Sequence, residues 1–311
     1  MTTEASERVA AARWSSRIGI FFVSLLLVTL VLHRFVGLPT PLALNLFVVG
    51  LAGVSLALPI GLMALARIWF TGQGGAGSAA AGILLALMAL GGPLIYASAH
   101  YDLPPINDVT TDPANPPAFA ELAKRPPGAN PIAYPGQRYA ELQAKAYPEL
   151  RTLVLDRSAE EAFELVEEAV RRLRWRVVVE EPPMPGRDAV PGLIEATDQT
   201  LVVGFTDDIV IRVGGGPTQA RIDARSASRY GSFDFGQNAA RVRSLLAEVR
   251  ARAEATPSIA AASKKRAGAA ARALLKRQKG RDQQKAESRN VRAPAKSDAQ
   301  RAPARKATPP L

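Results

Sequence analysis

The chain has 311 residues, a formal net charge of +11, two histidines and no cysteine. The lack of cysteine excludes disulfides, thiolate nucleophiles and cysteine-ligated metal sites. The charge is unevenly placed, because residues 256–311 hold 15 of the 39 lysines and arginines but only three acidic residues. The rest of the chain is nearly neutral, so the basic character belongs to a carboxy-terminal tail.

Three apolar segments fill most of the first hundred residues: Ile18–Leu32, Leu42–Arg67 and Ala79–Ala99. Each is long enough to cross or nearly cross a bilayer, which needs about 20 apolar residues in a helix. Backbone polar groups in hydrocarbon must bond within their own segment, so these runs are viable there only as helices. The first run exceeds a signal-peptide core of roughly 7–15 residues, and we expect it to stay as an anchor. Residues 1–100 are therefore predicted to form a transmembrane module of three helices.

The orientation of this module follows from its flanking charges. Arg8, Arg13 and Arg17 precede the first segment, and after the third segment no lysine or arginine follows until Lys124. The positive-inside bias then places the amino terminus in the cytoplasm and everything after residue 100 outside it. We expect a multi-pass protein of the inner (plasma) membrane with an extracytoplasmic, or periplasmic, soluble domain.

Small residues recur every four positions in the second segment, at Gly53, Ala57 and Gly61. This spacing gathers them on one helical face, where they permit close approach of another helix. The partner is either a neighbouring segment of this chain or a second copy of it. No charge lies deep in any segment, which argues against a proton or ion pathway.

Residues 101–150 are predicted to form a proline-rich connector. Ten prolines lie between Leu103 and Leu150, and they exclude a continuous helix or a central strand because each removes a backbone donor. The connector should be extended and partly laid across the folded domain. The apolar residues expected to make that contact are Ile106, Val109, Phe119, Tyr134 and Tyr139.

Residues 151–254 have the periodicity of a globular domain. Ser158 and Glu161 form a capping-box pattern before a helix, and GGGP after Val213 predicts a hairpin connection. A second amphipathic helix is expected from Gly236 to Ala253. Five strands with short connections are expected at Thr152–Leu155, Trp175–Glu180, Leu193–Thr197, Leu201–Phe205 and Asp208–Val213, and a sixth at Gln219–Ser226. The predicted fold is therefore an α+β two-layer domain, an antiparallel sheet covered by two helices.

Three stretches of the chain together resemble one protein family: LPPINDVTTDPANPPAF (Leu103–Phe119), IEATDQTLVVGFTDDIVIRV (Ile194–Val213) and RIDARSASRYGSFDFGQNAARVRSLL (Arg221–Leu246). They are similar to the domain of unknown function numbered 1499, and the resemblance covers about residues 103–253. It implies a membrane-anchored bacterial protein, because similar proteins often place membrane helices before this domain. It implies no activity, and the basic extension after about residue 255 lies outside it.

Six polar residues near one strand-to-helix junction form the candidate ligand-binding site: Ser226, Ser228, Arg229, Asp234, Asn238 and Arg241. Arginine forks and a helix amino terminus both favour phosphate or carboxylate binding. A structural interpretation explains the same residues. Asp234 can cap the following helix, and Arg229 or Arg241 can pair with Asp234.

The sequence shows little catalytic apparatus for this cluster. Serine catalysis needs a nearby base, but both histidines lie outside the domain, and residues 146–263 contain no lysine. Asp207 and Asp208 are neighbours on a predicted strand, so their carboxylates point to opposite faces and cannot easily share a proton or a metal ion. The histidines, His33 and His100, lack metal-ligand neighbours. We expect no metal site and no cofactor, and the sequence favours a protein that is not an enzyme.

The tail, residues 255–311, is too poor in large apolar residues to fold alone and is predicted to be disordered. Its first part, Ala260–Lys279, has the composition to form a helix on an anionic surface. Besides the bilayer itself, possible partners are anionic lipids or acidic envelope polymers, and nucleic acid is not expected outside the cytoplasm. A purely solvated extension is the alternative. The basic residues proposed for this contact are Lys264, Lys265, Arg266, Lys276 and Arg277.

Three functions are compatible with these patterns. The leading one is a non-enzymatic, membrane-anchored envelope protein that binds an envelope component or partner. The second is a hydrolase or transferase that uses the Ser226–Arg241 cluster. The third is a binder of anionic lipid or nucleic acid through the basic tail.

Overall fold

The computed structural model describes residues 9–184, 186, 190–256 and 271–281. The chain divides into two units, residues 1–256 and residues 257–311. In the second unit, residues 271–281 form a helix in which every residue is exposed, Lys276 and Arg277 included. Lys264, Lys265 and Arg266 lie outside the described residues.

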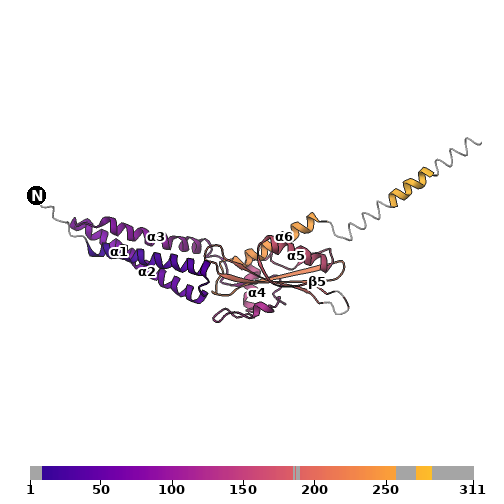
Figure 1. The fold of residues 1–311 in the computed structure, drawn as a ribbon, viewed down its shortest axis with the longest axis horizontal. Helices are drawn as coiled ribbons and strands as arrows, with labels where there is room; N and C mark the ends of the chain where they lie inside the picture. The colour runs from indigo at the N-terminus through magenta and orange to yellow at the C-terminus, as the bar shows by residue number, and fades with distance from the viewer. Residues whose placement is uncertain (1–8, 185, 187–189, 257–270, 282–311) are drawn as a thin grey trace, which may run out of the picture. The chain divides into compact units, whose positions relative to one another are not determined.

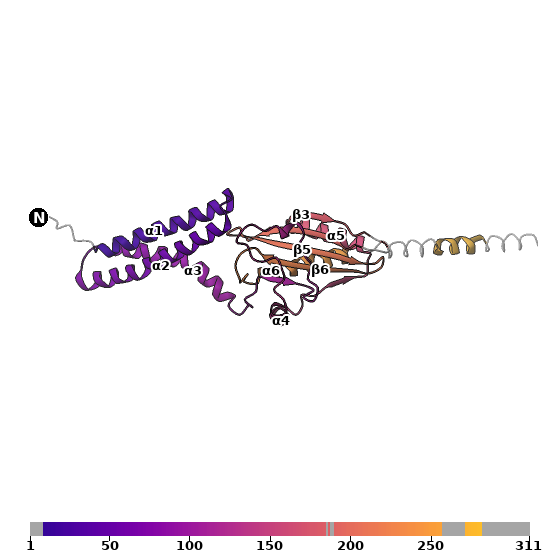
Figure 2. The same cartoon turned by 90° about the horizontal axis from the view of Figure 1, so that it is seen from below.

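The first hundred residues form three long helices, as predicted (Figure 1 and Figure 2). They are α1 (Ala10–Val31), α2 (Thr40–Thr71) and α3 (Ala76–Ala99), and a short π-helical segment, η1 (Leu32–Val36), extends α1. By length and composition all three can cross a membrane. The helices are longer than the predicted apolar segments because polar and small residues at the ends continue the helical backbone.

The small residues of α2 pack against the other two helices. Ser15 on α1 donates a hydrogen bond to the carbonyl oxygen of Ala57 at 2.8 Å. A Cβ atom on Gly53 would lie 2.3 Å from the ring of Phe22, and one on Gly61 would lie 2.6 Å from Ile83. Of the two uses expected for this face, the structure therefore shows packing within the chain.

The soluble domain is built on a six-stranded antiparallel sheet. Its strands are β1 (Asp108–Thr110), β2 (Leu153–Leu155), β3 (Arg176–Glu181), β4 (Gly192–Gln199), β5 (Thr206–Gly215) and β6 (Ala220–Ser228). Their order in the sheet is β1-β6-β5-β4-β3, and β2 pairs with the same edge of β6 as β1. GGGP lies at the β5–β6 connection, as predicted, and Gly215 there has a φ of 132° that favours glycine.

Two helices cover one face of this sheet, α5 (Ala159–Arg172) and α6 (Gln237–Ala255) (Figure 1). Ser158 caps α5 by accepting a hydrogen bond from the backbone N–H of Glu161. The domain is thus an α+β fold with an antiparallel sheet under two helices, as predicted. Side chains that fill the core between them include Ile194, Ile209, Ile211, Ile222, Phe163, Val166, Val242, Leu245 and Val249.

The proline-rich connector is part of this packing, on both faces of the sheet. Ile106 and Val109 are fully buried in the core under the helices. Phe119 and Leu122, the latter in a 3-10 turn η2 (Glu121–Ala123), pack on Val210 on the opposite face. The buried carboxylate of Glu195 accepts hydrogen bonds from the backbone N–H groups of Ala120 and Leu122 and so fixes this segment.

The connector is more regular than its prolines suggest. It contributes the strand β1 and a helix, α4 (Gln137–Ala146), which occupies the stretch between Pro135 and Pro148 that has no proline. Gln143 on α4 accepts a hydrogen bond from Thr110 N–H at 2.9 Å and donates one to its carbonyl oxygen at 2.6 Å. The side chain thereby satisfies the free edge of β1, which would otherwise expose unpaired backbone groups.

One predicted strand is wrong, because residues 200–205 form the turn between β4 and β5. Thr200 closes this turn, since its backbone N–H bonds to Phe205 O and its hydroxyl accepts from Phe205 N–H. The apolar side chains that suggested a strand are instead exposed, Leu201 to 88% and Val202 to 69%.

Candidate functional site

Four of the six predicted site residues meet beneath α6, on the helix-covered face of the sheet. Ser226 and Ser228 are two positions apart on β6, so they share this face. Asn238 in the first turn of α6 accepts a hydrogen bond from Ser226 Oγ at 2.7 Å and donates one to Ser228 Oγ at 2.9 Å. All three side chains are buried, so their hydroxyl and amide groups face one another and not solvent.

Arg241, one turn further along α6, connects this group to two carboxylates. Its Nη1 donates to Asn238 Oδ1 at 3.0 Å, and its Nη2 and Nε bond to Asp207 at 3.0 Å and Asp198 at 2.9 Å. Burial raises the pKa of the Asp207 carboxyl, and the charge of Arg241 opposes that rise. A guanidinium between two carboxylates has no free donor edge for an anionic ligand.

Asp234 has the helix-capping role that the structural interpretation assigned to it. Its Oδ1 accepts from Gly236 N–H at 2.9 Å and its Oδ2 from Asn238 N–H at 2.8 Å. The expected ion pair between Asp234 and Arg229 or Arg241 is not formed, because both arginines bind other carboxylates. Burial raises the pKa of Asp234, and the two backbone hydrogen bonds oppose this.

Arg229 is separated from the other five residues by the sheet. It bonds to Asp208 at 2.7 Å on the face that carries the connector, where Arg125 also reaches Asp208, at 3.1 Å. Asp207 points to the helix-covered face, so the two adjacent carboxylates lie on opposite faces, as predicted. The six residues therefore do not form one site.

The connector supplies partners that sequence reasoning did not assign. The carbonyl oxygen of Asn107 accepts from Asn238 Nδ2 at 3.0 Å and from Ser228 N–H at 2.9 Å. Asp108 forms a buried ion pair with Arg225 at 2.7 Å. Burial raises the pKa of Asp108, and the hydrogen bond from Arg225 opposes the rise. The only sequence signal for these partners was the run of polar residues in NDVTTD, which by itself is equally typical of turns.

The cluster of Ser226, Ser228, Asn238 and Arg241, here called the polar cluster, is chemically closed. Every side chain in it has a hydrogen-bond partner. In the part of the chain that the structure describes, no histidine or lysine contacts either serine hydroxyl. The carboxylate of Asp207 hydrogen-bonds the Ser228 side chain, but it is also paired with Arg241 and so is not a free general base for this serine. The arrangement stabilises the junction between β6 and α6.

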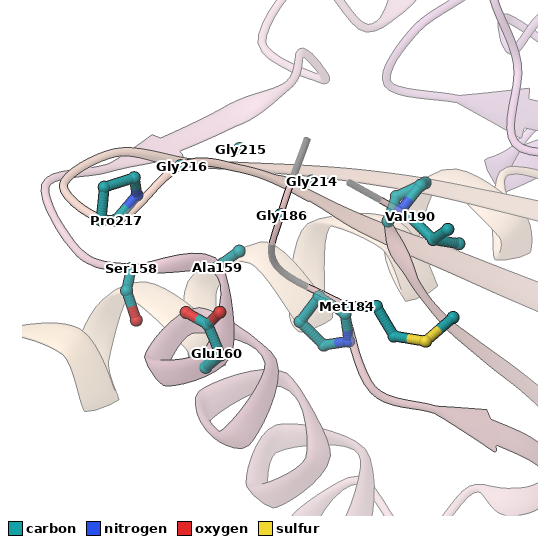
Figure 3. Close-up of a pocket in the computed structure, with 12 residues that line it drawn as sticks. Ser158, Ala159, Glu160, Met184, Gly186, Val190, Gly214, Gly215, Gly216 and Pro217 are labelled. Carbon is teal, nitrogen blue, oxygen red and sulfur yellow. The ribbon is translucent and has the colours of Figure 1, made fainter. Parts of the chain in front are cut away.

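A separate hollow lies at the other end of the domain, beside the β5–β6 connection (Figure 3). It has a volume of ≈ 370 Å³ and is lined largely by apolar groups from the start of α5, from Met184 and Val190, and from residues 214–217. Figure 3 shows Ser158 and Glu160 on the helix side of this hollow. Ser158 already caps α5, so the hollow offers few free polar groups to orient a ligand.

Comparison with protein families matches one model, described as Protein of unknown function (DUF1499), over residues 108–249. No curated protein and no solved structure matches the chain. The matched range starts at β1 and ends within α6, so it contains the whole sheet and the polar cluster. Residues 108–249 thus match the model of the DUF1499 family, and three helices able to span a membrane precede them in this chain.

Proposed function

We propose that this chain is a non-enzymatic binding protein of the cell envelope, anchored in the inner membrane with its DUF1499 domain on the outer side. The observation that carries the proposal is the closure of the polar cluster. Its serines are hydrogen-bonded to Asn238, and Arg241 is held between Asp198 and Asp207. Because these groups bond to one another, they are not available to a ligand, and we infer that the domain binds its partners through its surface.

Direct contacts support a domain that works at the membrane surface. His33 Nδ1 lies 2.9 Å from the carbonyl oxygen of Val203 in the β4–β5 turn, and Arg34 bonds to Gln199 at 3.1 Å. At the end of α3, the Tyr96 hydroxyl accepts a hydrogen bond from Gln237 on α6 at 2.9 Å. Two of the three helices thus hold the domain at the same end of the membrane module.

The charge distribution supports the orientation. Arg13, Arg17 and Arg67 lie near the helix ends away from the domain. At the end near the domain, the described part of the first three helices and η1 has one arginine, Arg34. The positive-inside bias favours the arginine-rich end in the cytoplasm. The domain then faces the periplasm or the outside.

Two measurements test this proposal. An alkaline phosphatase fused at residue 311 should be active, because this enzyme folds only outside the cytoplasm. A green fluorescent protein fused at the same position should not fluoresce. The purified full chain should show no turnover on a panel of esterase, phosphatase and glycosidase substrates. Turnover that is lost in Ser228→Ala but kept in Ser244→Ala, an exposed serine on α6, would instead establish an enzyme.

A further inference from the structure

Four arginines from distant parts of the chain line one open, polar pocket of ≈ 620 Å³ on the connector-covered face of the sheet. Arg34 comes from η1, Arg174 and Arg176 from the start of β3, and Arg229 from the end of β6. We call these four residues and the space between them the basic pocket.

The positive charge of the basic pocket is poorly compensated. Arg229 is bound to Asp208, and Asp198, the acidic residue that also lines the pocket, is bound to Arg241. Over the residues that the structure describes, no carboxylate forms an ion pair with Arg34, Arg174 or Arg176. Three uncompensated cations around one space repel each other, and an anion between them would remove that repulsion.

Arg34 is held by contacts with the β4–β5 turn, and Arg174 has an unusual backbone conformation. Arg174 follows the end of α5 with a φ of 59°, a left-handed conformation that usually carries glycine at this position. Gly204 has a φ of 83°, and a Cβ atom there would lie 2.8 Å from Arg34 Cδ and Nη1. The guanidinium of Arg34 thereby rests on the β4–β5 turn and donates to Gln199 and to Thr200 O.

If the first helix spans a bilayer, its length places the basic pocket at the level of the lipid headgroups. The first apolar helix, continued by η1, runs from Ala10 to Val36 and has 27 residues. At 1.5 Å per residue it is about 40 Å long, whereas the hydrocarbon core of a bilayer is about 30 Å thick. Its end therefore reaches the headgroup layer. Leu201 and Val202 in the adjoining turn, exposed to 88% and 69%, are apolar groups that the same interface would cover.

We propose that the basic pocket binds the phosphate of an anionic phospholipid headgroup. Guanidinium forks bind phosphate oxygens bidentately, and Arg34, Arg174 and Arg176 have donors available for this. The proposal rests on the membrane-anchored binding function above and names its ligand class. A free phosphate ester has the same recognition chemistry, so the source of the phosphate is decided by experiment.

The test uses the full chain, purified in detergent, with bound lipids counted by native mass spectrometry. Phosphatidylglycerol and phosphatidylcholine are added in parallel, and glycerol 1-phosphate is added in a third arm. The pocket variant is Arg174→Glu with Arg176→Glu. The matched control is Arg138→Glu with Arg221→Glu, two exposed arginines for which no ion pair is formed among the described residues. Both variants keep the tail and change the net charge equally.

We expect phosphatidylglycerol to bind the wild type and the control at least about tenfold more tightly than the pocket variant. Binding of phosphatidylcholine should be the same in all three proteins. Binding of glycerol 1-phosphate with the same dependence on Arg174 and Arg176, without lipid binding, would assign the pocket to a soluble phosphate and overturn the lipid headgroup. Equal binding by pocket and control variants in every arm would overturn the pocket itself.

Either failure leaves the fusion and turnover results unchanged, so it is distinguishable from failure of the proposed function. Circular dichroism checks that both variants fold.

Discussion

At the scale of single residues, buried ion pairs join separate segments of the domain. Arg225 is buried between the rings of Phe119 and Tyr134, with its guanidinium carbon 5.1 and 5.6 Å from the two ring centres, and its charge is met by Asp108. Such a pair contributes little net stability compared with apolar residues, but loss of one partner leaves a buried charge without compensation. Here the pair joins the connector to β6, so it also fixes which segment covers that face.

Replacing Arg225 alone should therefore be more damaging than replacing both partners. We expect Arg225→Met to lower the free energy of unfolding by about 3–5 kcal/mol, because Asp108 then stays buried without its cation. The double variant Arg225→Met with Asp108→Asn should recover much of this loss. Urea unfolding of the full chain in detergent, followed by tryptophan fluorescence, measures both values. A double variant as unstable as the single one would contradict the argument.

Glu167 on α5 makes the stability of the domain depend on pH. A hydrogen bond shared with Glu180 on β3 raises the pKa of Glu167 to about 7, and burial and the charge of Glu180 add to the effect. Because the folded pKa is above the ordinary 4.5, the pair stabilises the protonated form. This stability is present below about pH 4.5 and is lost as the pH rises through 7.

Glu167→Gln should remove that loss. We expect the variant to be more stable than the wild type by about 1 kcal/mol at pH 8, after allowance for solvent screening, and no more stable at pH 4. Thermal unfolding at the two pH values is the measurement. Glu254→Gln, an exposed change on α6, serves as the control, and an equal gain in both variants would refute the role of the Glu167–Glu180 pair.

At the scale of elements, close helix contacts organise the membrane module. A Cβ atom on Gly82 of α3 would lie 2.1 Å from Ser15 Oγ and 2.5 Å from the Ser15 backbone carbon on α1, whereas one on Gly91 would meet nothing within 4 Å. The two glycines share a helix but differ in what they face, so they form a matched pair for substitution.

Gly82→Ala should lower the free energy of unfolding in detergent by about 1–3 kcal/mol, because α1 must move away from α3. Gly91→Ala should leave it unchanged or raise it slightly, since alanine favours helix. Thermal unfolding monitored by circular dichroism compares the two. Similar midpoints for both variants would show that the contact near Ser15 does not limit stability.

The elements themselves were largely predictable, for physical reasons that also explain the failures. Alternation identified β5 and β6, and the capping pattern at Ser158 identified the start of α5. The apolar residues Leu201 and Val202 predict a strand where the structure has a turn, because apolar side chains suggest burial and these two are exposed. Helix α4 is not predicted, because the prolines on both sides of it indicate an extended segment.

The polar residues were harder to place than the elements. Their spacing brings Ser226, Ser228 and Asn238 together, and strand parity alone would have put Arg229 on the opposite face. The contacts with Asn107, Asp108 and Arg34 join segments about 100 residues or more apart, and a single sequence carries no local signal for such distances. For the same reason the basic pocket became visible only in three dimensions.

At the scale of the whole molecule, the compact unit ends at Thr256. Arg157, just before α5, donates hydrogen bonds to the carbonyl oxygens of Ala253 and Thr256, and Arg252 pairs with Glu168 at 2.7 Å. The last turns of α6 are therefore part of the domain, whereas residues 257–311 form the second unit.

Truncation after Thr256 should leave the thermal midpoint of the first unit unchanged, because none of these contacts is lost. Truncation after Arg250 should lower the free energy of unfolding by about 1–3 kcal/mol, since Arg157 and Glu168 lose their partners. The two shortened chains are compared with the full chain in detergent. A large loss on removing residues 257–311 alone would show that the tail contributes to the fold.

The junction between helix and sheet sets the reach of the domain. Only residues 100–107 separate α3 from β1, and eight residues extend at most about 28 Å. A tether this short denies the domain access to distant targets such as a facing membrane. For a target in the same bilayer as the three helices, encounters become a two-dimensional search whose rate depends on surface density and not on concentration in solution.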